Sequence, residues 1–118
     1  MERLFLMGRL LDYYGDFLTD RQKKLLTAYA VENLSLAEIA EREGISRQGV
    51  RDGLVRAERQ LTEMEERLGL ADKAAKLDAQ LKRVEDLSET FDLTETQRDA
   101  LNAALREVYT IWEDGNGI

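Results

Sequence analysis

The sequence contains no cysteine, no histidine and no proline. Without cysteine there is no disulfide framework, thiol nucleophile or cysteine metal site. Without histidine the commonest general base and metal ligand is missing. No glycine-rich phosphate loop or other metal-ligand cluster replaces them, so we expect no catalytic residue, no cofactor and no metal site. The absence of proline leaves long helices uninterrupted.

Long hydrophobic runs are also missing. No apolar stretch approaches the roughly 20 residues that a membrane-spanning helix needs, and the N-terminal residues lack a signal-peptide pattern. We therefore predict a cytoplasmic protein with no membrane insertion. The 118 residues of the chain suffice for a modest hydrophobic core.

Charge is distributed unevenly along the chain. Residues 1–34 and residues 35–60 each carry five basic and five acidic groups, whereas residues 61–118 carry seven basic and fourteen acidic groups. The net charge of −7 therefore lies in the second half. Non-specific DNA binding depends on neutralising phosphates, which makes an acidic chain a poor general DNA binder. Any contact with nucleic acid must come from a local basic face, and this disfavours a free-standing transcription factor.

The stretch from Ser35 to Glu58 has the pattern of a helix-turn-helix. Ser35 and Glu38 form a capping box, which predicts the start of a short helix. Gly44 supplies a left-handed residue to end it, and Ser46 can cap a second helix. Apolar residues of the second helix recur at spacings of three and four, namely Val50, Leu54, Ala57 and Leu61. A short helix, a tight glycine turn and a longer helix together predict a helix-turn-helix.

Two more helices are predicted before this motif. Residues 1–17 suggest a short helix with an apolar side that Phe5 and Tyr13 would widen, and Gly15 and Asp16 would break it. A second capping box, Thr19 with Gln22, opens a helix that extends to about Glu32. This helix would pack across the two that follow, as in a three-helix DNA-binding domain.

The second helix of the motif continues beyond the length of a minimal domain, and two apolar runs with coiled-coil spacing follow one another. The first runs from Leu54 to Ala71 and the second from Leu70 to Phe91. Gly69 lies where their registers disagree, which predicts a bend or break. We therefore predict an all-α fold with a helix-turn-helix domain at 1–68 and a C-terminal helical extension at 69–118. The two runs must pack on the N-terminal domain or on a second subunit, and we expect a homodimer.

The solvent side of the second helix holds the candidate nucleic-acid-binding residues. At about 100° per residue, the side opposite the apolar stripe carries polar and positively charged groups. Arginine can contact phosphate or guanine, and glutamine can contact adenine. Solvent alone also requires a charged face opposite a core face, so this signal is weak by itself. The candidates are Ser46, Arg47, Gln48, Arg51, Asp52, Arg56 and Arg59.

Three residues complicate this interpretation. Gly49 and Gly53 each cost roughly 1 kcal/mol relative to alanine in a helix interior. They would be useful where the backbone closely approaches a phosphate or another helix, and the sequence does not distinguish these two uses. Asp52 would repel phosphate unless it accepts from a cytosine amine or pairs with Arg56.

The motif residues from Leu34 to Glu41 and from Ile45 to Gln48 resemble those of the YlxM family. The opening from Leu10 to Tyr14, followed by Leu18, Thr19 and Gln22, is also similar to that family, and the likeness covers residues 4–68. The family consists of small bacterial proteins with a helix-turn-helix like region 4 of sigma factors. Its members usually have alanine and an aromatic residue where this chain has Gly49 and Arg51.

This resemblance implies an accessory of the signal recognition particle pathway, with the particle's RNA or its targeting GTPase as partner. A DNA-binding transcriptional regulator that uses the same helix is the second hypothesis. The third is a helical adaptor that binds a partner helix through its coiled-coil runs. A catalytic role is the least favoured of all.

Overall fold

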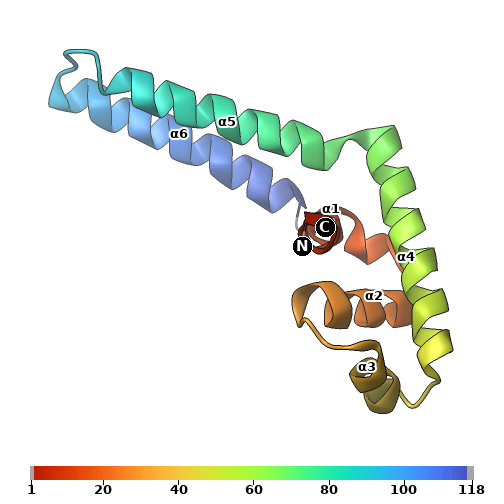
Figure 1. Ribbon diagram of the computed structural model, residues 1–118. Helices are drawn as coiled ribbons and strands as arrows, with labels where there is room; N and C mark the ends of the chain where they lie inside the picture. Colours follow the sequence, from red (N-terminus) through yellow and green to blue (C-terminus); the bar gives the residue numbers. More distant parts are fainter. Residues whose placement is uncertain (1, 117–118) are drawn as a thin grey trace. The chain divides into compact units, whose positions relative to one another are not determined.

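The computed structural model describes the backbone of residues 2–116 and the side chains of residues 2–112. It divides into two compact units, Met1–Ala71 and Asp72–Ile118. All regular elements in the described residues are helical, which confirms the all-α fold. In chain order they are α1 (Glu2–Tyr14), η1 (Gly15–Phe17), α2 (Asp20–Leu26), η2 (Thr27–Val31), α3 (Leu36–Glu43), α4 (Arg47–Leu68), α5 (Leu70–Ser88) and α6 (Glu95–Asn116) (Figure 1).

The predicted helix starts are confirmed by their capping contacts. The Thr19 side chain accepts from the backbone of Gln22 at the start of α2, and the Gln22 side chain accepts from the backbone of Thr19. Ser35 and Glu38 form the same reciprocal pair at the start of α3. Each box satisfies two backbone N–H groups that have no partner inside the helix.

Two glycines end the helices of the motif. Gly44 follows α3 with a φ of 69°, and Gly69 follows α4 with a φ of 65°. Both values lie in the left-handed region that glycine enters without a Cβ penalty. The break predicted at Gly69 is thus confirmed, and α5 begins at the next residue.

The second predicted helix ends near Glu32 as expected, but its last turn is not an ordinary α-helical turn. After Leu26 the chain widens into the π-turn η2, in which the N–H of Glu32 donates to the carbonyl of Thr27. Asn33 then adopts a φ of 60°, a conformation that asparagine tolerates better than most residues. The wide turn is not visible in the apolar spacing of the sequence, which fits an ordinary helix equally well.

The core of the first unit forms where α1, α2 and α3 pack on α4. Leu10 and Tyr14 of α1, Leu25 and Leu26 of α2, and Ile39 of α3 are all buried. α1 ends at Tyr14, so the helix break expected at Gly15 and Asp16 is confirmed, and the short turn η1 follows. The expectation that Phe5 widens its apolar side is wrong, because that side chain is 70% exposed. The first apolar run contributes Leu54, Ala57 and Leu61 of α4 to this core.

The second unit is an antiparallel hairpin of α5 and α6 (Figure 1). Thr94 and Gln97 form a capping box at the start of α6. Arg98 of α6 donates to the carbonyl oxygen of Ser88 at the end of α5, at 3.3 Å. No helix in the described residues is long and apolar enough to cross a membrane.

Candidate nucleic-acid interface

The candidate residues lie on α4 opposite its buried stripe. Val50, Leu54, Ala57 and Leu61 are buried in the first unit, as the spacing predicted. This burial fixes the rotation of α4, and therefore leaves the other side of the helix to solvent. We call the exposed residues Arg47, Gln48, Arg51, Asp52, Arg56 and Arg59 the α4 arginine face.

The turn before α4 leaves the start of this face open. The Ser46 hydroxyl accepts from the N–H of Gly49 at 2.9 Å and so caps the first turn of α4. Ser46 and Arg47 are themselves exposed. α3 packs on α4 across the left-handed turn at Gly44, which is the bihelical corner of a helix-turn-helix. The structure thus brings all seven candidate residues together on one capped helix.

Gly53 serves helix packing. A Cβ at this position would lie 2.5 Å from Cδ1 of Leu25, which is buried in α2. At the observed separation of α2 and α4, a side chain at residue 53 does not fit unless Leu25 moves. Of the two uses considered for this glycine, the structure shows close approach to a neighbouring helix.

The four arginines of the α4 arginine face make no ion pair with any described residue. Elsewhere in the first unit Arg3 is bound to Glu58, and Lys23 is bound to Asp16 at 2.6 Å. A surface that keeps four guanidinium groups unpaired can bind an anion without first breaking a salt bridge.

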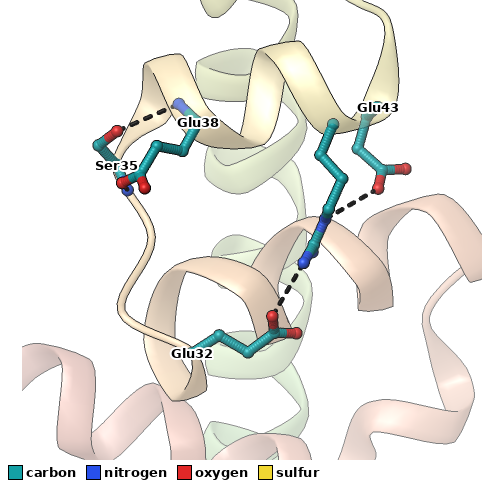
Figure 2. A network of polar contacts seen from close by, with 5 residues as sticks. Glu32, Ser35, Glu38 and Glu43 are labelled. Carbon is teal, nitrogen blue, oxygen red and sulfur yellow. Dashed lines mark hydrogen bonds and ion pairs between the residues drawn. The ribbon is translucent and has the colours of Figure 1, made fainter.

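Arg42 of α3 differs from the four α4 arginines because it is held by two carboxylates. Its guanidinium donates to Glu32 at 2.9 Å and lies 3.5 Å from Glu43 (Figure 2). The hydrogen bond to Glu32 raises the pKa of Arg42 above its usual value. These contacts join α3 to the residue that follows η2, so Arg42 acts within the fold. It is not available to a ligand in the way that the α4 arginines are.

The one carboxylate of the α4 arginine face, that of Asp52, accepts a hydrogen bond from a neighbouring side chain. Gln48 Nε2 donates to the Asp52 carboxylate at 2.9 Å, one turn along the helix. The Arg56 partner considered for Asp52 is not the one that the structure shows. A ligand that uses Gln48 must therefore compete with Asp52 for its amide.

Charge reverses along α4. Beyond Arg59 the exposed charged residues are Glu63, Glu66 and Arg67, so the net charge there is negative. The basic part from Arg47 to Arg59 covers twelve helical steps, or about 18 Å at 1.5 Å per residue. A polyanion would be attracted along this length and repelled beyond it.

Val55 was missed at the sequence level. Its side chain is 47% exposed between Arg51 and Arg59, each one turn away. It also lines an open groove of about 610 Å³ that is shared by α1 and α4, beside Arg3, Glu58 and Arg59. An apolar side chain in a groove-facing helix can contact the methyl group of thymine. In the sequence, the indication was that residue 55 is apolar but lies outside the row of apolar residues spaced three and four apart.

In the part of the chain that the structure describes, no group of three or more histidine, cysteine, aspartate or glutamate residues is arranged to hold a metal ion.

The family model that matches residues 1–101 is UPF0122, described as "Putative helix-turn-helix protein, YlxM / p13 like". A UPF0122 protein of Symbiobacterium thermophilum is 43% identical over 97 residues, which cover 82% of this chain and 83% of the relative. One from Desulforamulus reducens is 41% identical over 92 residues, covering 78% and 79%. One from Clostridium perfringens is 36% identical over 111 residues, covering 92% and 97%. The chain therefore belongs to the UPF0122 family of YlxM / p13-like helix-turn-helix proteins.

Proposed function

We propose that this protein is a non-enzymatic, cytoplasmic accessory of the signal recognition particle pathway that binds nucleic acid through the α4 arginine face. Membership of a helix-turn-helix family supports a nucleic-acid-binding, regulator-like role. The observation that carries the proposal is the set of four exposed arginines on the second helix of that motif, which make no ion pair with the residues that the structure describes.

The physical basis is phosphate neutralisation. Each arginine that pairs with a phosphate releases condensed counterions, and the affinity then falls as salt is added. Because the protein carries a net charge of −7, this attraction is confined to the α4 arginine face. Binding should therefore be weak on arbitrary sequences and strong only where a ligand fits the short basic stretch.

The link to the signal recognition particle rests on the YlxM resemblance, which implies the particle's RNA or its targeting GTPase as partner. The deep, narrow major groove of duplex RNA does not admit a helix. In this proposal the arginines therefore contact RNA at a loop, a bulge or an end. Contact with the GTPase would use the same positive surface.

A DNA-binding regulator is the second candidate, and the motif geometry favours it. In helix-turn-helix proteins the second helix lies in the major groove of B-DNA while the first crosses the backbone. α4 is capped and exposed at its first turn, as this docking requires. Glu38 and Glu41, exposed on α3, disfavour DNA binding in this geometry because their carboxylates would lie close to the backbone phosphates.

Fluorescence anisotropy with labelled ligands tests the proposal. The probes are signal recognition particle RNA and a 20-base-pair DNA duplex, titrated at low and at physiological salt. The decisive variant is Arg47→Ala, Arg51→Ala, Arg56→Ala. We expect it to lose at least tenfold in affinity and to flatten the salt dependence by about one phosphate contact per arginine.

The matched control removes three cations from the second unit, through Lys73→Ala, Lys82→Ala, Arg106→Ala. It has the same net charge as the decisive variant and should bind nearly as well as the unmodified protein. Preference for RNA at physiological salt supports the particle pathway, and preference for DNA supports the regulator. Equal binding by both triple variants would show that the α4 arginine face is not the site. Retention of the GTPase by the decisive variant in a pull-down would favour the adaptor hypothesis.

A further inference from the structure

The α5–α6 hairpin buries only the strip along which its two helices touch. Ala74, Leu81 and Ser88 of α5 and Leu105 of α6 are buried there. These residues recur every seven positions on α5, which is one coiled-coil seam. Two helices have only one such strip between them, so large apolar residues outside it stay half-buried or exposed within this unit.

Further apolar residues do occur, and they lie on one side. With about 100° of rotation per residue, these residues lie next to the buried strip on each helix. Because the two helices are antiparallel, both sets of residues then lie on the same side of the hairpin. Ile111 is 64% exposed and Leu87 47% exposed. We call this side the hairpin apolar face, formed by Leu77, Val84, Leu87, Leu101, Val108 and Ile111.

The opposite side of the hairpin is polar. Glu85, Asn102, Arg106 and Tyr109 line an open groove of about 420 Å³ there. The Tyr109 hydroxyl donates to Glu85 across it at 3.4 Å. The hairpin is therefore amphipathic as a whole, with one side suited to water and the other suited to a partner.

The edges of the hairpin apolar face differ in charge. Arg83 lies on the outer edge of α5, and Glu107 lies on the outer edge of α6. Neither residue makes an ion pair with any described side chain. The width of both helices separates them within one hairpin, so they cannot pair inside the same chain. The face thus has a positive group, Arg83, at its α5 edge and a negative group, Glu107, at its α6 edge.

We propose that the hairpin apolar face binds the same face of a second copy of this chain, forming an antiparallel four-helix bundle. The two-fold axis runs parallel to the helices, so that α5 of each copy packs against α6 of the other. This arrangement places Arg83 beside Glu107 of the second copy, twice in each dimer. A two-fold axis across the helices would instead bring like-charged edges together, and charge therefore selects the first arrangement.

This dimer does not require nucleic acid, so it can be tested independently of the proposed function. Sedimentation equilibrium of the full-length protein at micromolar concentration should give twice the mass of one chain. Ile111→Asp should abolish the dimer, since it would bury a carboxylate in an apolar interface. Circular dichroism should show unchanged helicity, because Ile111 is largely exposed in one copy.

A charge exchange tests the arrangement itself. Arg83→Glu and Glu107→Arg should each weaken the dimer about tenfold, because each replaces two attractive contacts by repulsive ones. The double variant should restore the affinity of the unmodified dimer. Arg106→Glu, the same change on the polar side, serves as the control and should leave the affinity unchanged. A monomer at all concentrations, or a double variant no tighter than the single ones, would overturn the proposal.

Discussion

The Tyr14 hydroxyl at the end of α1 donates to the Glu65 carboxylate of α4 at 2.7 Å. The same oxygen accepts from the N–H of Leu70 at 3.0 Å, and Glu65 accepts from the N–H of Ala71 at 3.0 Å. These are the first two N–H groups of α5, which no residue inside that helix can satisfy. A tyrosine and a glutamate that are 51 residues apart therefore cap one helix together.

Removal of this hydroxyl should destabilise the first unit. Tyr14→Phe leaves the Leu70 N–H without the hydroxyl that it donates to, and it removes one of the hydrogen bonds that the Glu65 carboxylate accepts. We expect the free energy of unfolding to fall by about 1–2 kcal/mol. Urea denaturation followed by circular dichroism measures the change. Tyr13→Phe is the matched control, because no hydrogen bond of the Tyr13 hydroxyl is present among the described residues. An equal loss in both variants would contradict the capping role.

Stability should also decline in alkali because of the same residue. Burial and then the hydrogen bond to Glu65 raise the pKa of Tyr14 to about 12. A pKa raised on folding stabilises the protein fully below the unfolded value of about 10, and this contribution is lost as the pH rises toward 12. The difference in unfolding free energy between the unmodified protein and Tyr14→Phe should therefore shrink over that window. A difference that stays constant from pH 8 to pH 12 would contradict the raised pKa.

Two glycine-to-alanine changes should have opposite effects. At Gly8 an added Cβ meets nothing within 4 Å, so Gly8→Ala should stabilise by about 0.5–1 kcal/mol through helix propensity. At Gly53 the added methyl meets the buried Leu25, and the overpacking exceeds the gain in propensity. We expect Gly53→Ala to destabilise by about 1 kcal/mol. Thermal denaturation distinguishes them, and stabilisation by both would show that α2 and α4 have room to separate.

The α4 arginine face should become a better anion binder when its only carboxylate is neutralised. Asp52→Asn keeps the size of the side chain and an oxygen that can still accept from Gln48. Removing one negative charge beside four arginines should tighten binding to nucleic acid severalfold at low salt, with less effect at high salt. Anisotropy titrations measure this, and Asp99→Asn in the second unit is the control. An unchanged or weaker affinity would mean that Asp52 itself contacts the ligand.

Local chemistry made much of the fold predictable. The capping pairs at Thr19 and Ser35 and the glycines at 44 and 69 each act within a few residues, so the sequence alone defines them. The pair of Tyr14 and Glu65 joins residues 51 positions apart, and no spacing rule connects them. The close approach of Gly53 to Leu25 likewise depends on how α2 crosses α4.

The candidate site was predictable to a similar degree. The helical period places Arg56 and Arg59 away from the core, and the structure shows them exposed. Which charges would be paired was not predictable, because it depends on side-chain contacts such as Gln48 with Asp52. Val55 was missed because a single apolar residue on a polar face belongs to no repeating pattern. The binding role of these residues stays a prediction.

The reversal of charge along α4 has a kinetic consequence. Because α4 is packed in the first unit, its positive charge toward Arg47 and negative charge toward Glu66 exert a torque on that unit in the field of any strongly charged polymer. Near a polyanion the torque favours an orientation in which the capped end of α4 points toward the polymer and its acidic end points away. Encounters would then begin in one orientation, and raising the ionic strength would slow their rate before it altered the docked complex.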